Sequence, residues 1–73
     1  MTQVEGYRIS KHANKRMRQR RINKNQLRQV LRHPLATVPG HTSHTRKVTG
    51  YVSGSRLRVI IDVVSNKVIT TYW

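Results

Sequence analysis

The first residues that could do chemistry are His12 and Arg16, within the stretch SKHANKRM. On a helix, residues four apart are neighbours, so these two side chains could act on one ligand. An imidazole moves protons near neutral pH, and a guanidinium stabilises negative charge that develops on a phosphate. Lys11 and Lys15 flank the pair, and the stretch contains no acidic residue. The pattern indicates proton transfer on an anionic substrate.

Each of these signals also has a simpler interpretation. A histidine on a basic helix is often an ordinary surface residue, and the run RMRQRR is typical of a solvated face or a phosphate-binding strip. His41 and His44 could share a metal ion, but the sequence offers no further ligand close to them, so a polar loop is the simpler interpretation.

Charge is the dominant feature of the composition. Fifteen Lys and Arg residues stand against two acids, Glu5 and Asp62, for a net charge of +13. We expect a polyanionic partner, with nucleic acid first and an acidic protein or a membrane surface as alternatives. Two acids far apart in sequence cannot supply the carboxylates of a magnesium-dependent nuclease or a glycosidase. Without cysteine there is no thiol nucleophile, and we expect neither metal nor cofactor.

One hydrolytic reaction needs neither metal nor carboxylate, namely the cleavage of RNA by its own 2′-hydroxyl. The nucleophile is already held beside the phosphate, so the protein must only move protons and neutralise developing charge. DNA lacks this hydroxyl and would stay intact. His12, with the cations around it, fits this chemistry.

Two short helices are expected to position these residues. Ser10 is a suitable N-cap for a helix that runs to about Arg20, with Ala13 and Met17 on its buried side. Asn23 and Gln26 form a capping-box-like pair for a second helix that ends at Pro34. The two helices are interpreted as a helical hairpin. The buried face of the second helix is expected to carry Leu27, Val30 and Leu31.

The second half of the chain favours strands. TRKVTGYV, RLRVIIDVV and KVITTYW are rich in β-branched residues and are separated by SGS and SN, which suit tight turns. We therefore predict one α+β domain over residues 1–73, a two-helix hairpin packed on a three- to four-stranded antiparallel sheet. Met1–Gly6 is expected to be a frayed lead-in, and LATVPGHTSHT receives no firm assignment.

Alternation predicts which strand residues face the helices. Leu57, Val59, Ile61 and Val63 should be buried, and Arg56, Arg58, Ile60 and Asp62 should lie on the opposite face. If Ser65 and Asn66 form a two-residue turn, then Val68, Thr70 and Tyr72 are buried, while Ile69, Thr71 and Trp73 lie beside Arg58. A shift of one residue in that turn would reverse the last assignment.

No apolar stretch approaches the roughly 20 residues of a membrane span. The N-terminus is basic where a signal peptide would be apolar. The sequence therefore predicts no membrane association and a cytoplasmic site of action.

Three segments together resemble a known family. ISKHANKRM, RINKNQLRQVLRHP and RLRVIIDVVSNKVITTYW are similar to small bacterial domains of the barnase/EndoU/colicin/RelE superfamily of toxin ribonucleases. The resemblance covers nearly the whole chain from Tyr7 onward, and SKH also resembles the helix start of colicin D, a tRNA nuclease. The segment LATVPGHTSHT matches no motif of the family.

The resemblance implies a metal-independent endoribonuclease toxin that cleaves tRNA or ribosome-bound mRNA. His12 would be catalytic, with Arg16 and Arg58 stabilising the phosphorane and a hydroxyl of Thr71 or Tyr72 orienting the phosphate. An acidic antitoxin or immunity protein would be its partner. The alternatives are a non-catalytic RNA- or DNA-binding module and a structural ribosome-associated protein. The residues expected to hold the RNA backbone are Lys11, Lys15, Arg18, Arg46, Lys47 and Arg56.

Overall fold

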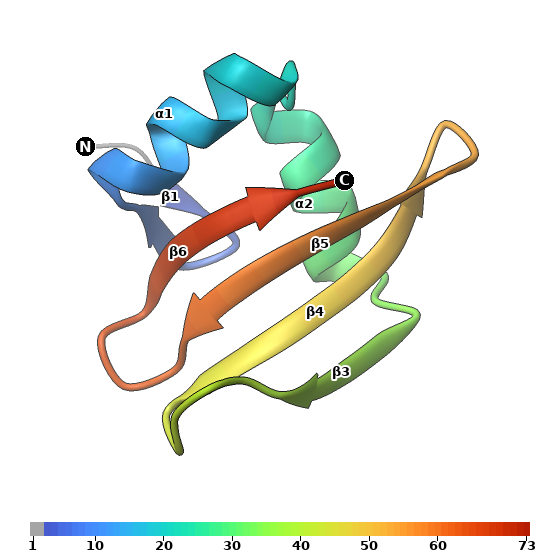
Figure 1. Ribbon diagram of the computed structural model, residues 1–73. Coiled ribbons are helices and arrows are strands. Elements are labelled where there is room, and N and C mark those ends of the chain that lie inside the picture. Colours follow the sequence, from blue (N-terminus) through green and yellow to red (C-terminus); the bar gives the residue numbers. More distant parts are fainter. Residues whose placement is uncertain (1–2) are drawn as a thin grey trace.

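The computed structural model describes residues 3–73, which form an α+β fold with two helices and a six-stranded mixed sheet. The strand order is β1-β2-β6-β5-β4-β3, and both helices lie on the same side of the sheet (Figure 1). The elements are β1 (Gln3–Val4), β2 (Tyr7–Ile9), α1 (Lys11–Arg20), α2 (Lys24–Arg32), β3 (Ala36–Pro39), β4 (Thr45–Val52), β5 (Ser55–Asp62) and β6 (Lys67–Tyr72).

The predicted sheet of three to four antiparallel strands is wrong in size and in direction. Strands β1, β2 and β3 are only two to four residues long, and β1 and β3 lie in segments for which no strand was predicted. β2 runs parallel to β6, with Ile9 opposite Val68, so the sheet is mixed. The predicted lead-in is also wrong over Gln3–Gly6, where β1 and β2 form a hairpin with Val4 buried. Residues 1 and 2 lie outside the described part.

Helix α1 begins where the sequence predicts. Ser10 is confirmed as the N-cap, because its Oγ accepts a hydrogen bond of 3.0 Å from the Ala13 N–H. Ala13 and Met17 are buried, and the helix packs on β6. It ends at Arg21, which takes a left-handed conformation with φ 55° and turns the chain toward α2.

Helix α2 carries the predicted capping box. The Asn23 side chain accepts from the Gln26 N–H at 2.8 Å, and the Gln26 side chain accepts from the Asn23 N–H at 2.9 Å. Leu27 and Val30 are fully buried, and the helix packs on β4, β5 and β1. The two helices thus cover different strands of the sheet, α1 over β6 and α2 over β4, β5 and β1.

Strands β4 and β5, of eight residues each, form the longest antiparallel pair of the sheet. Ser53 and Gly54 take positive φ values of 52° and 81° in the two-residue turn between them, as the SGS signal predicts. Leu57, Val59 and Ile61 are buried under the helices as predicted, together with Val48 and Val52 of β4. Val63 lies beyond the end of β5 and is exposed, so its predicted burial is wrong.

A bulge in β6 changes which residues face the helices. Ile60 pairs with Thr70 but Ile61 pairs with Val68, so Ile69 is an extra residue in the ladder. Val68 and Thr71 are therefore both fully buried, and Tyr72 lies opposite Arg58 on the other side. The predicted placement of Thr71 beside Arg58 and of Tyr72 in the core is wrong, because alternation along a strand does not survive an inserted residue.

Asp62 organises the loop from 63 to 66 that joins β5 to β6. Its Oδ1 accepts hydrogen bonds from the backbone N–H groups of Val64 (2.9 Å) and Ser65 (3.0 Å), and its Oδ2 lies 3.0 Å from His44 Nδ1. The bond from Ser65 lowers the pKa of the Asp62 carboxyl most. Partial desolvation opposes that effect, whereas Val64 and His44 lower the pKa further.

Replacing Asp62 by asparagine is expected to change how stability depends on pH. A carboxyl whose pKa is lower in the folded chain stabilises the fold above its ordinary value of 3.8 and loses that contribution as the pH falls through its folded pKa. In thermal melts, the melting temperature of wild type should therefore be higher than that of Asp62→Asn at pH 5. The difference between the two melting temperatures should vanish near pH 2. A difference in melting temperature that stays constant over this range would contradict the assignment.

Candidate nucleic-acid interface

One face of the sheet has no helix over it. Val48, Val52, Leu57 and Val59 point toward the helices, so the residues that alternate with them point the other way. We call this side the outer face. It comprises Ala36, Val38, Lys47, Thr49, Tyr51, Arg56, Arg58, Ile60, Thr70 and Tyr72.

Arginine and tyrosine side chains pair on the outer face. The Arg58 guanidinium lies 5.7 Å from the centre of the Tyr72 ring, its neighbour on β6. The Arg56 guanidinium lies 5.9 Å from the Tyr51 ring on β4. Cations stacked near aromatic rings are typical of surfaces that bind bases and phosphates together.

Two hollows meet at Lys47 on this face. The first, which we call the tyrosine hollow, measures about 260 Å³ and is lined by Pro39, Gly40, His41, Lys47, Ile60 and Tyr72. The second, the arginine hollow, measures about 360 Å³ and is lined by Leu35, Ala36, Lys47, Thr49, Arg56 and Arg58. The outer face therefore offers two adjacent depressions with a lysine between them.

His12, Arg16 and Arg20 follow one another at four-residue spacing along α1, and we call them the α1 stripe. The Arg20 guanidinium donates to the Thr71 carbonyl at 3.2 Å, and at the other end of the helix Ser10 Oγ donates to the Ile69 carbonyl at 3.2 Å. The stripe therefore runs along the edge of β6 that β2 leaves unpaired beyond Val68.

The structure does not bring His12 and Arg58 together. Arg58 pairs with Tyr72 near the end of α1 that carries Arg20, whereas His12 lies near its start. The rise of a helix over eight residues separates His12 from Arg20 by about 12 Å. His12 is exposed, and it lines neither of the two hollows. Arg16, half-buried and donating to the side-chain Oε1 of Gln19 at 2.8 Å, lies one helical turn from His12.

Thr71 and Arg46 are occupied by structural hydrogen bonds. Thr71 is 0% exposed, and its hydroxyl donates to the Arg58 carbonyl at 2.8 Å. A buried hydroxyl under the helices cannot reach a substrate, which corrects its predicted catalytic role. The Arg46 guanidinium donates to the carbonyls of Ser43 (2.9 Å) and Thr45 (2.7 Å), so it holds the turn before β4.

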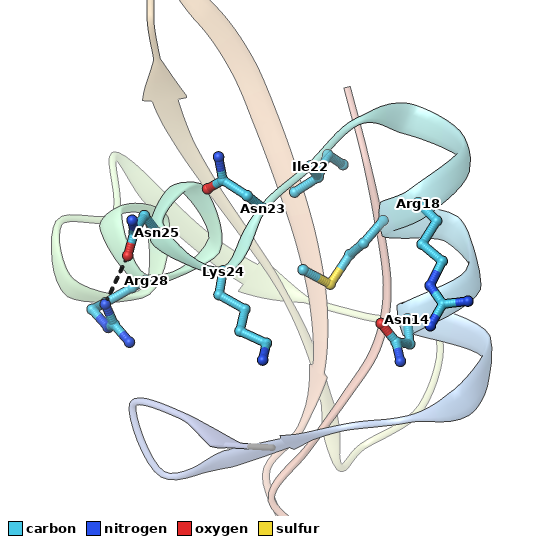
Figure 2. A pocket seen from close by; sticks show the side chains of 8 residues that line it. Asn14, Arg18, Ile22, Asn23, Lys24, Asn25 and Arg28 are labelled. Atoms are coloured by element: carbon cyan, nitrogen blue, oxygen red, sulfur yellow. Dashed lines mark hydrogen bonds between the residues drawn. The ribbon is translucent and has the colours of Figure 1, made fainter. Parts of the chain in front are cut away.

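The remaining predicted cations lie on α1. Lys11 and Lys15 are exposed on this helix. Arg18 lines a hollow of about 590 Å³ between the helices, where Asn14 and Arg18 stand on one side and Asn25 and Arg28 on the other (Figure 2). This hollow opens on the helix side of the sheet, so Arg18 does not join the outer face.

Both acids have side-chain partners away from the α1 stripe, Glu5 in ion pairs with two arginines and Asp62 in a hydrogen bond with His44. Glu5 Oε1 lies 3.3 Å from Arg32 Nε and 3.7 Å from Arg28 Nε, and Asp62 contacts His44. Between residues 3 and 73, no three His, Cys, Asp or Glu side chains gather as metal ligands would. In the same stretch, neither helix is long and apolar enough to cross a membrane.

Sequence reasoning missed Tyr51 and Arg20 as members of the site. Tyr51 alternates with Lys47 and Thr49 along β4, so the period-two pattern could have placed it with Arg56. Arg20 also accepts, through its backbone carbonyl, a hydrogen bond of 2.8 Å from the Trp73 indole N–H. Trp73 thus docks on the end of α1 with 39% of its surface exposed.

The fold and the site define a small basic α+β domain with a cationic, tyrosine-bearing sheet face. The chain belongs to the family described as a domain of unknown function, DUF4258, whose model matches residues 9–73. No curated protein matches the chain. No solved structure matches it either.

Proposed function

We propose that this domain acts on RNA as a metal-independent endoribonuclease. The observation that carries the proposal is the exposed His12 at the start of α1, one helical turn from Arg16, in a basic chain whose Glu5 is held by two arginines and whose Asp62 is bonded to His44. Such a site attracts phosphates and has no free carboxylates to hold a metal ion beside them.

The proposed reaction uses the ribose of the substrate. His12 takes the proton of the 2′-hydroxyl, the 2′-oxygen forms a bond to phosphorus, and the bond from phosphorus to the 5′-oxygen breaks. The leaving 5′-oxygen takes a proton from solvent water, His12 releases its proton back to solvent, and the product ends in a 2′,3′-cyclic phosphate. Arg16, one turn from His12, stabilises the charge of the phosphorane. Arg58 lies on β5, opposite Tyr72 and toward the other end of α1, so it is too far from His12 for that role and instead binds a neighbouring phosphate.

The test is incubation of the purified protein with total tRNA in EDTA. Wild type is expected to release fragments with 2′,3′-cyclic phosphate ends. The cleavage rate of His12→Ala is expected to be lower by at least about 100-fold, because general acid–base catalysis is typically worth 10²–10⁴-fold. His33→Ala removes another exposed histidine, on α2, and should cleave like wild type. Equal cleavage by wild type and His12→Ala would contradict the proposal, as would cleavage of DNA of the same sequence.

A second candidate function is RNA binding without cleavage. The stacked pairs Arg58–Tyr72 and Arg56–Tyr51 favour it, because they suit a nucleic acid strand and require nothing of His12. Binding of tRNA by wild type and His12→Ala alike, with no fragments from either, selects this function.

The charge of the domain also suggests a protein partner. An acidic antitoxin or immunity protein that covers the outer face in the cytoplasm would keep the domain from tRNA or ribosome-bound mRNA. Charge complementarity would make their association fast and sensitive to salt.

A further inference from the structure

The outer face is shaped for bases as well as for phosphates. The tyrosine hollow has three apolar walls, formed by the Tyr72 ring, Pro39 and Ile60. Its lining also includes the cationic Lys47 and the polar His41. The arginine hollow carries the guanidinium groups of Arg56 and Arg58. Their volumes lie at or below the lower end of the range of roughly 300–1,000 Å³ found for drug-sized ligand sites, so each suits one planar group rather than a folded ligand.

Lys47 connects the two hollows. It is the one residue that lines both, and on β4 it stands two residues from Thr49 of the arginine hollow. Successive outward residues of a strand are about 6.6 Å apart, so an ammonium group at this position reaches a phosphate between two neighbouring depressions. Arg58 at 5.7 Å from the Tyr72 ring adds a cation beside the first hollow.

We propose that the outer face binds an unpaired RNA strand, with one base in the tyrosine hollow, the next base in the arginine hollow and the intervening phosphate on Lys47. This inference rests on the proposed action on RNA and adds the kind of RNA. A base can enter these hollows only when it is unstacked from a helix, so single-stranded segments bind and continuous duplexes do not. Stacking on tyrosine and arginine tolerates any base, which predicts weak sequence preference.

The test measures binding without cleavage. A fluorescein-labelled 2′-O-methyl RNA octamer of mixed sequence lacks the attacking hydroxyl, and its fluorescence anisotropy is followed alone and after annealing to its complement, at one salt concentration. The single strand is expected to bind at least about 10-fold more tightly than the duplex. Equal or tighter binding of the duplex overturns the proposal.

Tyr72 itself provides matched variants. Tyr72→Leu keeps an apolar side chain and is expected to weaken octamer binding by about 10-fold, as loss of one stacking platform implies. Tyr72→Phe retains the ring, loses only the hydroxyl and should bind like wild type. Equal losses from Tyr72→Leu and Tyr72→Phe overturn the placement of the base.

A salt titration gives a second measurement that does not depend on the tyrosines. Lys47→Met should reduce the slope of log affinity against log salt by about one, as loss of one phosphate contact does. An unchanged slope overturns the role of Lys47. If the protein cleaves tRNA but binds the octamer no better than the duplex, the proposed function holds and this inference is wrong. If it binds the octamer tightly but cleaves no RNA, the inference holds and the proposed nuclease activity is wrong.

Discussion

Leu57→Ala is expected to lower the free energy of unfolding by about 2–5 kcal/mol, the range for a leucine removed from a packed core. Leu57 is 0% exposed near the start of β5, opposite Gly50 on β4, and belongs to the same core cluster as Leu27 and Val30 of α2. A domain of this size melts roughly 4–8 °C lower for each kcal/mol lost. The melting temperature should therefore fall by roughly 8–40 °C.

The matched control is Leu35→Ala. Leu35 is 60% exposed just before β3, so the same change of side chain there should alter the free energy of unfolding by less than about 0.5 kcal/mol. Urea unfolding followed by circular dichroism measures both variants. Similar losses at the two positions would mean that the core is not centred on β5.

Gly50→Val is expected to push α2 away from the sheet. A Cβ atom at Gly50 would lie 3.2 Å from Val30 Cγ2 and 3.3 Å from Val30 Cα, closer than side chains normally pack, and the two further methyl groups of valine have no space. Overpacking of this kind costs about 1–3 kcal/mol. Gly50→Ala should show the smaller effect, since it adds only the Cβ atom. Urea unfolding gives both values.

The contact with Val30 can be tested separately. If the helix is the obstacle, Val30→Ala combined with Gly50→Val should lose less free energy of unfolding than the sum of the two single changes, because they act on one contact. Thr49→Val alters the neighbouring residue, which faces outward on the same strand, and should have little effect. Strict additivity would show that the strain at Gly50 arises elsewhere.

The parts of the fold that the sequence predicts correctly depend on short-range patterns. Ser10, Asn23 and Gln26 fix the helix starts through bonds to residues three positions away, so the residue types alone reveal them. The Ser53–Gly54 turn and the alternation of β5 are equally local. Strands β1 and β3 are too short to show alternation, and the return of β2 alongside β6 joins residues about sixty positions apart. No local pattern records that pairing.

The site was harder to predict for the same reason. Arg58 and Tyr72 are neighbours only because of the bulge at Ile69, and the residue types around Ile69 do not predict a bulge. Thr71 faces the core through the same bulge and is thereby removed from the predicted catalytic group. His12 and Arg16 were paired correctly as helix neighbours, but their distance from Arg58 depends on how α1 lies along β6.

The parallel contact between β2 and β6 has a consequence during synthesis. Residues 7–9 emerge from the ribosome early, yet their partner strand is Lys67–Tyr72. Helix α1 packs on the same strand, so Ala13 and Met17 become buried only when β6 is present. Pairings of such long sequence separation form late and slowly. A nascent chain that lacks residues 67–72 therefore has neither the complete six-stranded sheet nor the Tyr72 wall of the tyrosine hollow.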